Sequence, residues 1–324
     1  MSLKASNKIA AENFVSHYDI HRPVNWAEHF DRPGPLEVEI GFGLGEFLIQ
    51  LARQNPDRNF VGFENDWARV HKALAKAKRI KSEAKVSLNN LRFLHVDAQV
   101  AFERLFAPRS IHRLHSLFPC PWPKKKHVKY RLFSHDFLKL MNSRLIDRGE
   151  AKIVTDHAPF LAWVQEEARE SGFKMKREVI APQFDTKFER KWCELGQKEF
   201  FVLELVKEQH FSIPVLEDCE LKTYTLEKFD PERFEFANII DRDSISVILK
   251  EFLFDPIRQR GMIRLVAVEK TITQNVWLMI STAGGRRSPG KWSIAPAVGQ
   301  AILPTPGIAM ALEAVYCSAQ QTIP

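Results

Sequence analysis

A glycine-rich turn follows the first strongly apolar run of the chain. The run covers residues 36–40, and Gly41, Gly43 and Gly45 come next, just before a helical pattern over 46–54. Glycine lets the backbone turn tightly and lie close to a ligand. The G-x-G-x-G spacing is not the dinucleotide pattern G-x-G-x-x-G, and no lysine or serine follows in the register of a P-loop. The turn therefore predicts a ligand site that is not built mainly around a pyrophosphate.

Three carboxylates accompany the turn, each near the end of a predicted strand. Glu39 precedes the turn, Glu64 ends the run 59–64, and Asp97 follows the run 91–96. A carboxylate after the second strand can accept both ribose hydroxyls, and one after the third can accept from an adenine amino group. Glu39 suits a cationic amine or sulfonium. Together they predict a site for S-adenosyl-L-methionine; the alternatives are a solvated strand end for Glu64 and a helix N-cap for Asp97.

The most unusual stretch is residues 117–131, LFPCPWPKKKHVKYR. Its three prolines restrict φ and remove backbone donors, so it should leave the sheet as a stiff loop. Its basic side chains are Lys124, Lys125, Lys126, His127, Lys129 and Arg131. Clustered charge beside the aromatic face of Trp122 suits a nucleic acid, which offers phosphates and a base to stack. The alternative is a solvated basic loop around a structural tryptophan.

Two later segments carry further polar groups. Asp156 ends the fifth predicted strand and should lie in the same crevice, while Thr186–Arg190 precedes the last strand. Glu189 could accept hydrogen bonds from the N1–H and exocyclic amine of a guanine, and Thr186 could bond the base or the cofactor. The alternative for either segment is an ordinary loop or helix cap.

Alternating strands and helices must position these residues. Strands are predicted at 36–40, 59–64, 91–96, 113–118, 151–155 and 198–206. Helices are predicted at 46–54, 67–81, 98–106, 132–145 and 159–171. This alternation predicts a Rossmann-like α/β fold with a parallel sheet and crossover helices.

The pattern changes after residue 207. A linker is predicted around 213–220, and a separate, smaller α+β domain should follow. It is expected to contain strands near Phe234 and at 263–269, 276–281 and 292–296, with helices at 244–252 and 306–319. The predicted organisation is an N-terminal extension over 1–35, a first domain over 36–207 and an appended domain over 208–324.

Composition and charge narrow the functional classes. The 324 residues are 45% apolar and 27% charged, which predicts a folded globular chain. No apolar run approaches the ~20 residues of a membrane helix, and no signal peptide is recognised. Four scattered cysteines without a CxxC pair predict no disulfide framework or metal site and fit a cytoplasmic location. The net charge is +8 over residues 1–210 and −1 beyond, so a polyanionic partner is expected for the first part.

The ordered motifs resemble a known family over residues 36–206. They are Glu-Ile-Gly-Phe-Gly-x-Gly, Phe-x-Gly-x-Glu, Asp-Ala, Phe-Pro-x-Pro-Trp-Pro-Lys-Lys-x-His, Thr-Asp and Thr-Lys-Phe-Glu. This set is similar to that of the bacterial tRNA (guanine-N7-)-methyltransferases. The resemblance implies a class I S-adenosyl-L-methionine-dependent methyltransferase fold and methylation of N7 of a guanine in the variable loop of tRNA.

The resemblance also implies roles for individual residues. The cofactor-binding set is Glu39, Gly41, Gly43, Gly45, Glu64, Asp97 and Cys120. The substrate-binding set is Lys124, Asp156, Thr186, Lys187, Phe188 and Glu189. The RNA-contacting set is Lys126, His127, Lys129 and Arg131, and the catalytic positions are Cys120 and Asp156.

One departure concerns the catalytic position. The family pattern is Phe-Pro-Asp-Pro-Trp, and its acid is regarded as catalytic, whereas this chain has Cys120 there. A neutral thiol cannot supply the charge of a carboxylate. Guanine N7 nevertheless carries a free lone pair and no proton, so alignment of the reactants could suffice. The alternatives are a weak or inactive tRNA-binding protein on the same fold, a small-molecule methyltransferase, and covalent catalysis by the cysteine, which N7 chemistry does not need.

The second departure is the appended domain, which the family does not require. Its dense basic spot is Arg286, Arg287 and Lys291, which could contact tRNA or form a solvated turn. The domain could equally serve dimerisation or folding, so both a monomer and a homodimer are compatible with the sequence.

Overall fold

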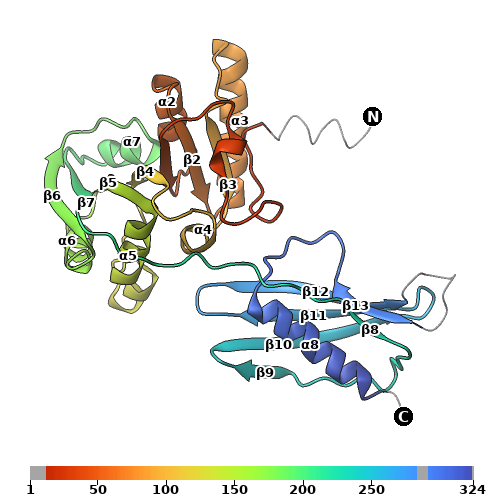
Figure 1. Cartoon of the computed structure of the whole chain (residues 1–324). Helices are drawn as coiled ribbons and strands as arrows, with labels where there is room; N and C mark the ends of the chain where they lie inside the picture. Colours follow the sequence, from red (N-terminus) through yellow and green to blue (C-terminus); the bar gives the residue numbers. More distant parts are fainter. Residues whose placement is uncertain (1–11, 283–290, 323–324) are drawn as a thin grey trace. The chain divides into compact units, whose positions relative to one another are not determined.

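The chain forms two compact units in the computed structural model, which describes residues 12–282 and 291–322. The units comprise residues 1–216 and 217–324 (Figure 1). The first holds a seven-stranded sheet and the second a six-stranded sheet. Among the described residues, no helix has both the length and the apolar character needed to cross a membrane.

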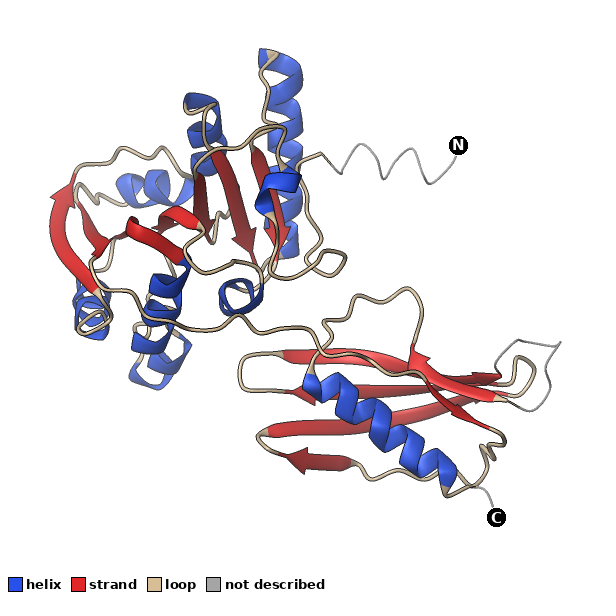
Figure 2. Cartoon of the chain, in the orientation of Figure 1, coloured by secondary structure: helices blue, strands red, loops and turns tan. Residues whose placement is uncertain are grey.

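The first sheet has the strand order β3-β2-β1-β4-β5-β7-β6. Figure 2 draws the strands of both sheets in red and the helices in blue. Its strands are β1 (Leu36–Ile40), β2 (Asn59–Glu64), β3 (Leu91–His95), β4 (Ile111–Leu117), β5 (Leu145–Thr155), β6 (Phe173–Ile180) and β7 (Phe200–Lys207). Strands β1 to β5 pair in parallel, whereas β7 runs antiparallel to both β5 and β6. This order with its reversed strand is that of the class I S-adenosyl-L-methionine-dependent methyltransferases, so the predicted fold is confirmed.

Helices connect the strands of this sheet. They are α2 (Glu46–Gln54), α3 (Trp67–Ala84), α4 (Ala98–Arg104), α5 (His135–Arg144), α6 (Ala158–Glu167) and α7 (Lys187–Glu194), with short 3-10 helices η1 (Trp26–His29) and η2 (Lys125–Tyr130). The predicted strands and helices of this unit are present, with ends shifted by a few residues. Strand β6 and helix α7 were not predicted.

Capping side chains fix where several helices begin. Asp66 caps α3, Asp97 caps α4, His157 caps α6 and Thr186 caps α7, each by accepting from a backbone N–H of the first turn. Three of these helices directly follow a strand of the parallel part of the sheet. Their first turns therefore lie at the carboxyl edge of the strands, where ligands of such folds bind.

The second unit is an antiparallel sheet covered on one face by a helix. The strand order is β8-β13-β12-β11-β10-β9, and helix α8 packs on β8, β10, β11 and β13. The elements are β8 (Tyr224–Leu226), β9 (Ile239–Arg242), β10 (Ile245–Asp255), β11 (Arg260–Val268), β12 (Thr273–Thr282), β13 (Trp292–Pro296) and α8 (Pro306–Gln320). The predicted α+β character is therefore confirmed.

Two predicted elements of the second unit are wrong. The expected helix over 244–252 is strand β10, which pairs with β9 and β11. The register shifts between Leu249 and Glu251, and this bulge interrupts the alternation of apolar and polar residues that marks a strand. The expected strand near Phe234 is irregular backbone, although the Phe234 ring is buried against Phe229 and Phe252.

The basic spot of the second unit is only partly described. Arg286 and Arg287 lie outside the described residues. Lys291 is exposed and forms an ion pair with Glu227, with 3.2 Å between Nζ and Oε1. Its contact is thus with a neighbouring carboxylate.

Candidate active site

The glycine turn begins where β1 ends. Gly41, Gly43 and Gly45 all have positive φ angles, of 74°, 56° and 70°. A Cβ on Gly45 would lie 3.0 Å from the Cβ of Ala73 and 3.2 Å from the ring of Phe93, so a side chain there would be both strained and crowded. The turn therefore needs glycine to pass between β1 and α2.

Glu64 joins the end of β2 to this turn. Its Oε2 accepts a hydrogen bond from the backbone N–H of Gly43 at 3.0 Å. Its Oε1 accepts from the backbone N–H groups of Asn65 and Asp66, at 3.1 and 3.2 Å. The structure thus brings the second predicted acid into direct contact with the predicted turn.

Glu39 is a buried carboxyl without a partner on one oxygen. The residue is 2% exposed, and its Oε2 has no hydrogen-bond partner among the described residues. Burial, and then the charge of Glu64, raise the pKa of Glu39 to about 8. A cation beside this carboxyl would stabilise its ionised form.

Asp97 lies at the start of α4, one strand further along the sheet. Its Oδ1 accepts from the backbone N–H of Gln99 at 2.8 Å, so it has the capping role that the sequence offered as its alternative. The adjacent Val96 donates its backbone N–H to the carbonyl of Glu64 at 3.2 Å. Asp97 therefore comes directly after the residue whose backbone is hydrogen-bonded to that of Glu64.

Helix α7 lies over the glycine turn. The pocket between them is about 30 Å³, room for one or two water molecules. Its lining residues are Glu39, Gly41, Phe42, Gly43, Leu44, Glu46, Leu117, Phe118, Thr186, Lys187 and Phe188. A Cβ on Gly43 would lie 3.8 Å from the Phe188 ring, which shows how closely α7 approaches the turn.

Glu46 fastens α7 to α2. Its Oε2 accepts the backbone N–H of Lys187 at 2.6 Å, and its Oε1 lies 2.8 Å from both Arg190 Nη2 and Lys76 Nζ. Burial alone would raise the pKa of Glu46, but the donors from Lys76, Arg190 and Lys187 outweigh it and lower the pKa. No local pattern in the sequence indicated this long-range contact.

Glu189 and Thr186 shape the turn that leads into α7. Glu189 is buried; its Oε1 accepts from the backbone N–H of Gln183, and its Oε2 from those of Phe184 and Asp185, at 2.6–2.8 Å. The Thr186 Oγ1 accepts the Glu189 backbone N–H at 3.2 Å. Thr-x-x-Glu is the capping-box spacing, so the sequence did contain a signal for this helix start.

The proline-rich loop follows β4, next to the end of β5. The backbone N–H of Phe118 donates to the carbonyl of Val154 at 2.8 Å, and Asp156 follows two residues later. Cys120 is exposed, and Asp156 is half-buried. The predicted catalytic positions therefore follow adjacent strands at one edge of the sheet.

The basic stretch forms η2 and its flanks. Lys124, Lys126 and Lys129 are exposed. The ring of Trp122 lies 5.5 Å from that of His127 and 5.4 Å from that of Tyr130. Aromatic faces and exposed cations thus share one short segment.

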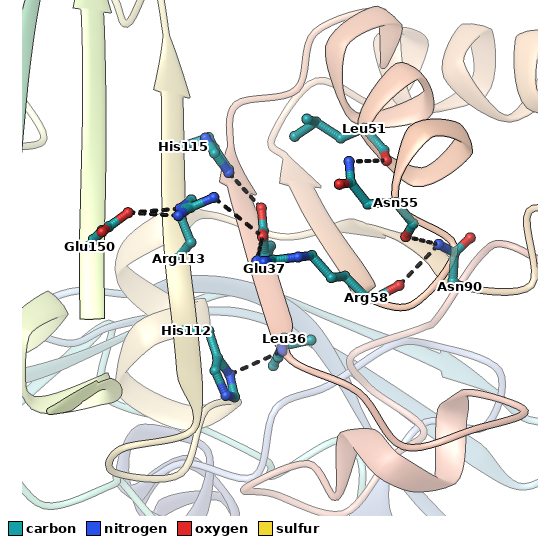
Figure 3. Close-up of polar contacts among 10 residues, drawn as sticks. All are labelled: Leu36, Glu37, Leu51, Asn55, Arg58, Asn90, His112, Arg113, His115 and Glu150. Carbon is teal, nitrogen blue, oxygen red and sulfur yellow. Dashed lines mark hydrogen bonds and ion pairs between the residues drawn. The ribbon is translucent and has the colours of Figure 1, made fainter. Parts of the chain in front are cut away.

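Buried charges lie deeper in the same sheet, on β1 and β4 (Figure 3). Glu37 Oε2 is 2.9 Å from His115 Nε2, and Oε1 contacts Arg58 and lies 3.7 Å from Arg113. Burial lowers the pKa of His115, while His115, Arg58 and Arg113 outweigh burial and lower that of Glu37. Sequence reasoning missed this cluster, although a glutamate two residues before Glu39 inside an apolar run was a signal.

Comparison with known proteins identifies the family of this chain. A family model described as "Putative methyltransferase" matches residues 33–202. A tRNA (guanine-N(7)-)-methyltransferase of Chlorobium phaeobacteroides is 45% identical over 177 residues, which are 55% of this chain and 84% of that protein. Proteins of the same name from Thermotoga maritima and Aquifex aeolicus are 36% and 31% identical; the matches cover 56% and 70% of this chain and 57% and 74% of those proteins. The chain belongs to the tRNA (guanine-N7-)-methyltransferase family.

Proposed function

We propose that this protein transfers the methyl group of S-adenosyl-L-methionine, the cofactor of its family, to N7 of a guanine in the variable loop of tRNA. The observation that carries the proposal is the convergence at one sheet edge of Glu39, the glycine turn, Glu64 and the proline-rich basic loop. Family membership supports the reaction and the class of substrate. The basic charge of residues 1–210 supports a polyanionic substrate.

The residues at the glycine turn fit this cofactor. Glu39 has a buried carboxyl oxygen without a partner and a raised pKa, so a cationic amine or sulfonium would satisfy it. Glu64 would exchange its bond from the Gly43 N–H for ribose hydroxyls, and Asp97 would accept from the adenine amino group. When bound, the cofactor supplies a methyl group on a sulfonium, which makes that carbon electrophilic.

The substrate side needs alignment more than acid–base chemistry. N7 of guanine has a free lone pair and no proton to lose, so an in-line attack requires no general base. We assign the guanine edge to Asp156, because both oxygens of Glu189 already accept backbone N–H groups. The rest of the guanine pocket would be formed by Lys124, Thr186, Lys187 and Phe188.

The basic stretch would hold the RNA. Lys126, His127 and Lys129 would contact phosphates, and the exposed Tyr130 beside Trp122 offers a surface on which a base can stack. Each phosphate contact should appear as a salt-dependent contribution to tRNA affinity.

A second candidate function, a tRNA-binding protein with little or no catalysis, rests on Cys120. The exposed thiol stands where the family pattern has an acid. An aspartate there would be negatively charged beside a sulfonium, whereas a neutral thiol is not.

The two candidates are separated by one assay. Purified protein and its Cys120→Asp variant would be incubated with unmodified tRNA transcript and methyl-labelled S-adenosyl-L-methionine, and the label mapped by nuclease digestion. Label on N7 of a variable-loop guanine with the wild type supports the proposed enzyme. Label only with the Asp variant supports the tRNA-binding protein with little or no catalysis. Failure of both the wild type and the variant to bind tRNA would contradict both candidate functions.

A further inference from the structure

Arg131 ends the basic stretch, but its guanidinium is engaged by the protein itself. Its Nε–H donates to the carbonyl of Pro121 at 2.9 Å, and its Nη2–H to that of Trp122 at 3.3 Å. Its Cζ lies 4.9 Å from the ring centroid of Trp163 and 5.8 Å from that of Phe160, both on α6. Arg131 therefore connects the proline-rich loop to a helix on the other side of it.

The loop that Arg131 contacts is strained. Phe118 has φ of 54° and Trp122 has φ of 42°, in the left-handed region that glycine favours. Such conformations are unfavourable for residues other than glycine and persist only where the surroundings hold them. The three prolines between positions 119 and 123 also remove backbone donors from the loop. External donors to its carbonyl groups must therefore help to keep it in shape.

We propose that Arg131 is a positioning residue, which holds Cys120 and Trp122 in place by donating hydrogen bonds to the carbonyl groups of Pro121 and Trp122 while its guanidinium packs on the aromatic rings of α6. This inference rests on the proposed function, since it assigns the reaction geometry to the loop. It differs from the phosphate-binding role that the resemblance implied for Arg131. Lys126 and Lys129 remain for the RNA, because they are exposed.

The chemistry of the contact requires arginine. Two N–H groups in one plane reach two adjacent carbonyl groups, while the flat guanidinium faces the Trp163 ring. A lysine keeps the charge but offers a single ammonium on a flexible stem, and it cannot reproduce the planar pair of bonds. Replacing Arg131 by lysine therefore separates geometry from charge.

The test compares Arg131→Lys, Arg131→Gln and the matched charge-removing variant Lys129→Gln in the methylation assay. We expect Arg131→Lys to lower kcat about tenfold or more while the KM for tRNA stays near the wild-type value, because small misplacements of reacting groups are costly. Lys129→Gln should raise KM and flatten the dependence of tRNA affinity on salt. Arg131→Gln should leave that salt dependence unchanged.

Two results would overturn the inference. One is a wild-type kcat in Arg131→Lys; the other is a salt dependence in Arg131→Gln as flat as that of Lys129→Gln. If Arg131→Lys does not fold, Trp163→Leu tests the same contact from α6 and should lower kcat in the same way.

A measurement that does not depend on catalysis tests the positioning role of Arg131 independently of the proposed function. The backbone amides of Phe118 and His127 donate to the carbonyl groups of Val154 and Lys124, and their hydrogen exchange should be at least about tenfold faster in Arg131→Lys than in the wild type, since the loop is released. Equal exchange would refute the positioning role. An inactive wild type with faster exchange in the variant would contradict only the proposed function.

Discussion

Arg190 Nη2 lies 2.8 Å from Glu46 Oε1, and this ion pair fastens helix α7 to the helix that follows the glycine turn. The pocket beneath measures about 30 Å³, far below the few hundred Å³ typical of ligand pockets. We therefore expect α7 to move when the cofactor binds. The strength of the ion pair between Arg190 and Glu46 should set how often α7 moves.

Loosening this ion pair should speed cofactor exchange. Arg190→Gln is expected to raise both the association and dissociation rates of S-adenosyl-L-methionine, by about fivefold at most, because a partly exposed pair contributes up to about 1 kcal/mol. Stopped-flow tryptophan fluorescence measures both rates. Lys191→Gln, on the same helix but stacked on Trp192, is the matched control and should change neither. Identical rates in the two variants would contradict the role of the ion pair.

The buried carboxyl of Glu39 should make stability fall as pH rises. Its folded pKa of about 8 lies above the ordinary value of 4.5, so the folded state keeps a proton that the unfolded chain has lost. The contribution is complete below pH 4.5 and disappears as pH rises through 8. Glu39→Gln should therefore gain stability over the wild type between pH 5 and pH 9, by on the order of a few kcal/mol. Urea unfolding at both pH values measures this; a constant difference would disprove it.

Cofactor binding should release a proton from the same carboxyl. A cation beside Glu39 lowers its pKa below the value of about 8, so near pH 7 binding converts a protonated carboxyl to a carboxylate. Calorimetric titration of S-adenosyl-L-methionine in buffers of different ionisation enthalpy should show release of up to about one proton. The release should vanish in Glu39→Gln. Binding enthalpies that do not depend on the buffer would rule it out.

The buried cluster around Glu37 should stabilise the sheet above neutral pH. Glu37→Gln leaves the cations Arg58 and Arg113 without their carboxylate and removes the carboxylate partner of His115, so it should cost about 3 kcal/mol. The lowered pKa values of His115 and Glu37 both make the folded state less stable in acid. The free energy of unfolding falls as pH drops below 6.5, where His115 of the unfolded chain gains a proton, and it falls further below pH 4.5, where Glu37 of the unfolded chain does. Urea unfolding at pH 7.5 and pH 5 measures both effects. Glu150→Gln, which removes a half-exposed partner of Arg113, is the control and should cost under about 1 kcal/mol.

The sequence predicted the edge of the sheet where the candidate site lies. Parallel strands end at a common edge, so acids and glycines after successive apolar runs had to meet there. The contact between Glu64 and Gly43, 21 residues apart, follows from that rule. Its geometry does not, because the sequence left the N-cap role of Asp97 as one of two alternatives and could not show that Glu189 is occupied by backbone N–H groups.

Long-range contacts and a bulge account for most of what was missed. Glu46 and Arg190 are 144 residues apart, and no local pattern connects them. In β10 the bulge between Leu249 and Glu251 adds one residue, so apolar positions recur at helical spacing instead of alternating. Arg131 was predicted to contact RNA like the other cations of its stretch. Its partners are backbone carbonyl groups, which every residue has, so no residue type in the sequence indicates them.

The reversed strand β7 has a consequence for how the protein is made. Strand β6 pairs only with β7 among the described strands of its sheet, and β7 ends at Lys207. During synthesis β6 therefore leaves the ribosome without a neighbour and waits until residue 207 has emerged. A chain terminated before β7 should expose an unpaired strand edge and aggregate. The time between the emergence of Ile180 and that of Lys207 should therefore set how long the nascent chain stays vulnerable.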